Sequence, residues 1–96
     1  MLIQNTKIEV GDIITLKMMG GDELVCRFEG NSGDSVIVSH PQLVMMAQQG
    51  FGLMPYVLTC EPTTKMQISP KDIVIKTKTI DAVAKEYIKQ RSGLQM

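Results

Sequence analysis

The segment from Asp12 to His40 constrains the fold most, because its apolar and polar residues alternate in three short runs separated by two glycine turns. In the first run Ile14, Leu16 and Met18 fall on one face, with the period of two expected of a half-buried strand. Gly20-Gly21-Asp22 follows this run. Glycines between two alternating runs are a hairpin signal because they tolerate positive φ. The segment therefore predicts the start of an antiparallel meander.

The second and third runs continue this meander. The second run is one-sided, and its apolar face consists of Leu24, Cys26 and Phe28. Gly30 to Asp34 are almost all turn-forming residues, and Val36 to Val38 then form a β-branched run that favours a third strand. Pro41 has no amide hydrogen to donate to a sheet, so the third strand is predicted to end or bend there.

The segment from Pro41 to Gly52 is apolar, although it lies between predicted strands, where loops are usually polar. Large apolar side chains in a loop need a cover. The segment either folds back on the core of its own chain or contacts another subunit, and flexible methionine side chains suit both. Its large apolar residues are Leu43, Val44, Met45, Met46 and Phe51.

Residues 53–60 are predicted to form a fourth strand. Its Pro55 favours an edge position or a bulge, because proline cannot donate to the sheet. One face of this strand consists of Met54, Tyr56, Leu58 and Cys60.

Residues 65–68 and 72–76 flank a break at Ser69-Pro70. They are predicted to form one bent fifth strand or two short pieces. Residues 1–11 alternate loosely, which favours an extended lead-in or a short added strand.

The C-terminal part of the chain, residues 79–92, is predicted to be a helix. Thr79 is the expected N-cap, Asp81 lies in the first turn, and Gly93 is the expected stop. The helix has one apolar face with the spacing i, i+3, i+4, i+7 and i+8. This face consists of Ile80, Val83, Ala84, Tyr87 and Ile88.

These patterns together predict a mainly β fold in a single domain spanning residues 1–96, with strands over about 12–77. The core is expected to draw on the inward positions of the strands. These are Ile14, Leu16, Met18, Leu24, Cys26, Phe28, Val36, Val38, Leu58, Ile73 and Ile75.

The composition predicts a soluble, cytoplasmic protein. No segment is apolar enough to cross a bilayer, and no signal peptide is recognisable. Cys26 and Cys60 each lie in an apolar segment, so both are expected to be buried as free thiols. The formal net charge is zero, but residues 1–61 carry three basic against seven acidic side chains and residues 62–96 carry seven against three. The excess of basic side chains in residues 62–96 indicates either solvated surface lysines or a nucleic-acid contact.

No motif indicates catalysis or a cofactor. One histidine and two distant cysteines cannot form a structural zinc site of the usual spacing. Gly20-Gly21 joins two strands and precedes no Lys-Ser or Lys-Thr, so it is not a phosphate loop. We therefore expect no metal, no cofactor and no enzymatic activity.

The strand order, the turn positions and two residues of the first Sm motif resemble the Sm-like (LSm) family. Gly21 matches a glycine between the first two strands of that family, and Asp34 matches an aspartate before its third strand. The resemblance covers roughly residues 10–77 and is greatest to small Sm-like proteins attributed to cyanophages. It implies a five-stranded, strongly bent SH3-type antiparallel barrel, here with a C-terminal helix. It also implies homo-oligomeric rings in which the fourth strand of one subunit pairs with the fifth of the next.

The RNA motifs of this family are not intact here. The RNA-contacting asparagine of the family falls on Val38, and its second motif falls on Ser69 to Lys71. The helix lies after the strands, whereas the family typically has it before them. The nearest RNA contacts that the resemblance implies are Ser39, His40, Ser69 and Lys71. The residues expected at an oligomer interface are Met45, Met46, Met54, Tyr56, Leu58, Ile73 and Ile75.

Two functions follow as hypotheses. The first is an RNA-chaperone-like ring that binds single-stranded RNA. The alternative is a structural or protein-binding ring, for example of a phage or its host, without nucleic-acid binding. A monomeric barrel is a third possibility, and the number of subunits stays open.

Overall fold

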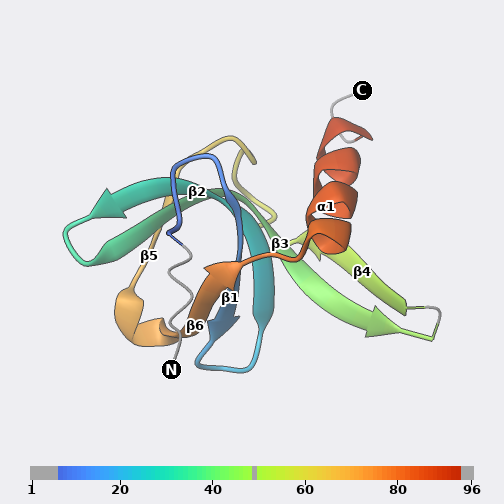
Figure 1. Ribbon diagram of the computed structural model, residues 1–96, viewed down its shortest axis with the longest axis horizontal. Helices are drawn as coiled ribbons and strands as arrows, with labels where there is room; N and C mark the ends of the chain where they lie inside the picture. Colours follow the sequence, from blue (N-terminus) through green and yellow to red (C-terminus); the bar gives the residue numbers. More distant parts are fainter. Residues whose placement is uncertain (1–6, 49, 94–96) are drawn as a thin grey trace.

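The computed structural model describes residues 7–48 and 50–93, and its strands form one antiparallel sheet beside a C-terminal helix (Figure 1). The predicted class, mainly β with a C-terminal helix, is confirmed. The elements are β1 (Ile13–Met18), β2 (Glu23–Ser32), β3 (Ser35–Ala47), β4 (Gly50–Pro55), β5 (Met66–Ile68), a 3-10 helix (Pro70–Asp72), β6 (Ile73–Lys78) and α1 (Asp81–Gly93).

The sheet has the order β4-β3-β2-β1-β6, and β5 adds to β3 beside the first half of that strand. The predicted meander is confirmed, because β1 pairs with β2 and β2 pairs with β3. Gly21 (φ +105°) supplies the positive φ of the first turn and Gly33 (φ +59°) that of the second.

The predicted closure into a five-stranded barrel is wrong for the described residues, which form an open sheet of six strands. The break at Ser69-Pro70 divides the fifth strand into β5 and β6, which have different partners. β5 pairs with β3 over three residues, and β6 pairs with β1. The 3-10 helix between them turns the chain, so β5 does not extend to close the sheet.

The third strand bends near Pro41, as predicted, but continues to Ala47. His40 has a positive φ of 51°, and the pairing of β3 with β2 shifts register between Ser39 and Gln42. Pro41 thus lies in a bulge, where no amide hydrogen is needed. The apolar segment predicted as a loop is in fact a hairpin, formed by the end of β3 and by β4.

The core lies on one face of the sheet. Its buried side chains are Ile14, Leu16, Leu24, Cys26, Phe28, Val36 and Val38, and Met18, Leu43, Ile68 and Ile73 pack partly buried against it. Leu58 and Ile75 were predicted in the core but are exposed. Leu58 lies in the loop after β4, and Ile75 is opposite Lys17 in the register, on the outer face of the sheet, so neither reaches the core. Cys60, predicted to be buried, is exposed in the same loop.

The opposite face of the sheet is covered in part by α1. Tyr87 and Val25 are buried there, although Val25 is not on the face of its strand that was predicted to be apolar. The helix begins at Asp81, so Thr79 is not its N-cap. The Thr79 hydroxyl instead forms a hydrogen bond with the Thr15 hydroxyl of β1 (2.8 Å). On the predicted apolar face of the helix, Ile80 and Ile88 are exposed.

Candidate functional site

The hairpin formed by the end of β3 and by β4 extends away from the body of the molecule (Figure 1). It belongs to a stretch from Ser35 to Cys60 that contains no Asp, Glu, Lys or Arg. Its exposed large side chains are Met45, Met46, Phe51 and Met54. An uncharged, apolar projection of this kind is typical of a surface that contacts another molecule.

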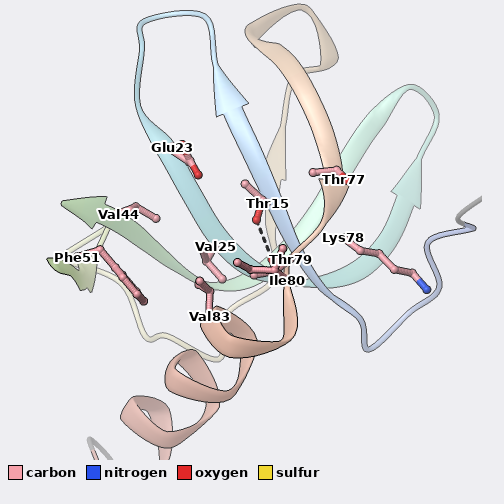
Figure 2. A pocket seen from close by; sticks show the side chains of 10 residues that line it. All are labelled: Thr15, Glu23, Val25, Val44, Phe51, Thr77, Lys78, Thr79, Ile80 and Val83. Carbon is pink, nitrogen blue, oxygen red and sulfur yellow. Dashed lines mark hydrogen bonds between the residues drawn. The ribbon is translucent and has the colours of Figure 1, made fainter. Parts of the chain in front are cut away.

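A groove of about 270 Å³ lies between this hairpin, the outer face of the sheet and the start of α1. We call it the hairpin groove, and Figure 2 shows the ten side chains that line it. Its floor includes Val25, and Thr15 is directly opposite Val25 in the register of β1 and β2. The rest of its apolar lining consists of Val44, Phe51, Ile80 and Val83.

Two charged residues of opposite sign, Glu23 and Lys78, are also part of the lining, but the side chain of Lys78 extends away from the other lining residues (Figure 2). Glu23 lies 3.9 Å from Lys17, and Lys78 lies 3.5 Å from Asp12, so each already has an ion pair within the chain. Such exposed pairs contribute little to stability and can be re-formed with a partner.

The predicted interface residues lie in three places. Met45, Met46 and Met54 are exposed on the hairpin, and Tyr56 and Leu58 are exposed in the loop after it. Ile75 is exposed on β6, whereas Ile73 packs partly buried against the core. The hairpin and β6 form opposite ends of the sheet.

The predicted RNA contacts lie near the two ends of the short pairing of β3 with β5. Ser69 follows Ile68, which is opposite Val36, and Ser39 and His40 follow Val38, which is opposite Met66. Ser39 and His40 are buried. Ser69 is half-buried and Lys71 is exposed, in the 3-10 turn.

Ser39 belongs to a polar cluster beneath the bend of β3. Its hydroxyl donates to Oε2 of Glu29, and the Arg27 guanidinium donates to the same oxygen at 2.9 Å. Burial alone would raise the pKa of Glu29, but these hydrogen bonds and the positive charge of Arg27 outweigh it and hold the pKa below its usual value. Nδ1 of His40 lies 3.3 Å from the Ser39 hydroxyl. The cluster therefore ties the bend of β3 to the neighbouring strand β2.

A negative charge lies close to the end of β4. Burial, together with a hydrogen bond to Asp22 and the negative charge of that residue, raises the pKa of Tyr56. β6, at the other end of the sheet, carries Lys76 and Lys78. The two ends of the sheet thus differ in charge.

Sequence reasoning missed the hairpin groove. Its strongest signal in the sequence is the uncharged stretch from Ser35 to Cys60, which is too long to be a loop and contains two strands. The part of the groove lining that β6 and α1 supply could not be recognised from neighbouring residues in the sequence. Thr15 and Thr77, for example, become neighbours only through the pairing of β1 with β6.

No protein-family model matches the sequence, and no curated protein matches it. Among residues 7–48 and 50–93, no helix is long and apolar enough to cross a membrane. In the same part of the chain, no group of three His, Cys, Asp or Glu residues is placed to hold a metal ion. A function must therefore be argued from the chemistry of the surface.

Proposed function

We propose that the protein is a self-assembling structural or protein-binding module whose copies join head to tail, with β4 of one copy pairing with β6 of the next. The observation that carries this proposal is the sheet order, which leaves β4 and β6 at opposite ends. Both strands have six residues, so their lengths match.

The physical reason is the cost of an open sheet edge. Among the described residues neither strand has a partner on its outer side, so one row of its backbone groups is available to another chain. Each edge also exposes large apolar side chains, Met54 on β4 and Val74 and Ile75 on β6. Pairing the two edges satisfies the backbone groups and covers these side chains.

The two edges are chemically different, which favours a head-to-tail contact over a symmetric one. β4 carries no charge and ends close to Asp22, whereas β6 carries Lys76 and Lys78. A contact between unlike surfaces repeats from copy to copy and gives a ring if the rotation closes. The resemblance to Sm-like proteins supports the same arrangement, because that family builds rings by pairing its fourth and fifth strands.

The test uses one variant for each edge. Met54→Glu places a charge on β4, and Ile75→Glu places one on β6 opposite Lys17, with which it can pair within the chain. Both side chains are exposed, so the fold should survive. We expect each variant to have a lower solution mass than the wild type by light scattering, because each lacks one half of the contact.

An equimolar mixture of the two variants gives the sharper result. The intact β4 edge of Ile75→Glu can pair with the intact β6 edge of Met54→Glu, so the mixture should form larger species than either variant alone. A symmetric contact through one edge would not be rescued by mixing. Val10→Glu, a charge on an exposed valine outside both edges, is the matched control and should keep the wild-type mass.

Binding of single-stranded RNA by the same assembly is a second candidate, favoured by the exposed lysines of the C-terminal half. Lys71 is exposed in the 3-10 turn, and Lys76 and Lys78 are exposed on β6. Ser39 and His40 are buried, so contact with a base would require the bend of β3 to open. RNA binding would therefore rest on backbone phosphates and would weaken steeply with salt.

The test is the fluorescence anisotropy of a labelled oligouridine at low and high salt. Lys71→Ala should weaken binding and reduce its salt dependence, whereas Lys85→Ala, which removes an exposed lysine from α1, should change it less. An absence of binding at low salt would exclude this function without affecting the assembly proposal.

A further inference from the structure

We propose that a second copy of this chain docks on the hairpin groove about a two-fold axis, through a contact separate from the β4 and β6 edges. The inference goes beyond the head-to-tail assembly and does not depend on it. If both contacts form, they join two head-to-tail assemblies face to face.

The first support is a continuous apolar face on the hairpin. Met46 of β3 is directly opposite Phe51 of β4 in the register, and Phe51 lines the groove. Val44, two residues before Met46, lies on the same face and also lines the groove. Met46 is 82% exposed and Phe51 is 41% exposed, so the face has no adequate cover within the described chain.

The second support is a ridge on the helix that adjoins the groove. Ile80, Ala84 and Ile88 follow one another at intervals of four residues, so they form a stripe along one side of α1. Ile80, just before the first residue of α1, is 70% exposed and also forms a wall of the groove. Ile80 thus belongs both to the groove and to the helical stripe. When a second copy is rotated by half a turn about an axis near Ile80, the stripe of each copy can lie in the groove of the other.

The third support is the lack of charge on the surfaces that would meet. Lys78 contributes to the groove lining, but it is opposite the buried Ile14 in the register and its side chain extends away from the groove (Figure 2). The hairpin that would enter the contact has no charged residue to desolvate. An apolar surface of this kind can pack against its own copy without leaving a charge buried and unpaired.

The available area is sufficient for a small specific contact. Given residue areas on the order of 200 Å², the exposed parts of Met46, Phe51, Ile80 and Ile88 amount to roughly 500 Å² per copy. Two copies would then bury about 1,000 Å², which is near the lower limit for a stable protein–protein interface.

The primary test is Ile80→Glu, which places a charge on the residue that belongs to both the hairpin groove and the helical stripe. Ile80 is exposed, so circular dichroism should show an unchanged fold. We expect light scattering to show half the wild-type mass, whereas Val10→Glu should keep the full mass. An Ile80→Glu protein with the wild-type mass overturns the proposal.

Adding Ile80→Glu to the Ile75→Glu variant distinguishes this proposal from the head-to-tail one, because Ile75→Glu removes only the head-to-tail contact. Ile75→Glu alone should be a dimer held by the groove contact, and adding Ile80→Glu should give a monomer. A monomeric Ile75→Glu protein overturns the groove contact. A wild-type dimer that is unaffected by Ile75→Glu and dissociated by Ile80→Glu supports the groove contact and excludes the head-to-tail one.

Another occupant of the groove would give a different result. A wild-type protein that stays monomeric at high concentration and floats with vesicles of neutral phosphatidylcholine would show that the apolar face contacts lipid. That result overturns docking of a second copy.

Discussion

The hydroxyl of Tyr87 donates a hydrogen bond of 2.8 Å to the backbone carbonyl of His40, 47 residues earlier in the chain. Tyr87 is on α1, and His40 is at the bend of β3 with a φ of +51°. The amide of His40 donates in turn to the carbonyl of Pro62. The helix and the loop after β4 thus both contact the bend that directs the hairpin, so the groove depends on this point.

Tyr87→Phe should destabilise the fold by about 1 kcal/mol, because it removes a buried hydrogen bond and keeps the ring. Urea denaturation at neutral pH measures this free energy of unfolding. Tyr56→Phe is the comparison, since it removes a hydrogen bond to Asp22 at an exposed site in the loop after β4. It should change stability by less than about 0.5 kcal/mol. Equal losses in the two variants would show that the contact with His40 has no special role.

The left-handed backbone conformation of His40 leads to a second prediction. A left-handed φ costs a branched residue more than it costs asparagine, which tolerates this region. His40→Val should therefore be less stable than His40→Asn by about 1–2 kcal/mol in the same urea assay. If valine were the better tolerated residue, the bend would adopt an ordinary β conformation in solution.

The bend also explains how far the sequence predicted the fold. The meander and the break at Ser69-Pro70 were predicted, because alternation, glycine turns and proline are local signals. The continuation of β3 through Pro41 was not predicted, because a proline that falls in a bulge keeps its strand. Whether a bulge forms is decided by distant contacts, here the Glu29 to Ser39 hydrogen bond and the Tyr87 hydroxyl.

The candidate site was predictable only in part. Met45 and Met46 stood out in the sequence as apolar residues in need of a cover, and both are exposed. The spacing of α1 predicted a buried stripe, but Ile80, which lines the open groove, and Ile88 are both exposed. Helical periodicity identifies an apolar face but does not tell whether the same chain covers it.

Glu29 should make stability depend on pH in the acid range. Its folded pKa lies below its usual value of 4.5, so it stabilises the fold above that pH and loses this contribution as the pH falls through the folded pKa. Ser39→Ala removes one of the hydrogen bonds that lower this pKa. The variant should lose about 1.5–3 kcal/mol at neutral pH, as expected for a hydrogen bond to a charged group.

Urea unfolding at neutral pH and at about pH 3 checks this linkage. The wild type should lose more stability between the two pH values than Ser39→Ala, because the variant has already lost part of the Glu29 contribution. Ser32→Ala, at an exposed serine of β2, should follow the wild type. Parallel losses in the wild type and Ser39→Ala would mean that Glu29 does not titrate with a lowered pKa.

The two thiols should differ in reactivity, because one is inside the core and the other is in the loop after β4. Burial raises the pKa of Cys26 to about 12, so almost no thiolate is present at neutral pH, and the sulfur is covered as well. Cys60 is exposed. Iodoacetamide should therefore add one group to the native protein, at Cys60, and a second group only in denaturant. Mass spectrometry of Cys60→Ser should show no rapid adduct, and a native adduct on Cys26 would mean that the core face of the sheet opens readily.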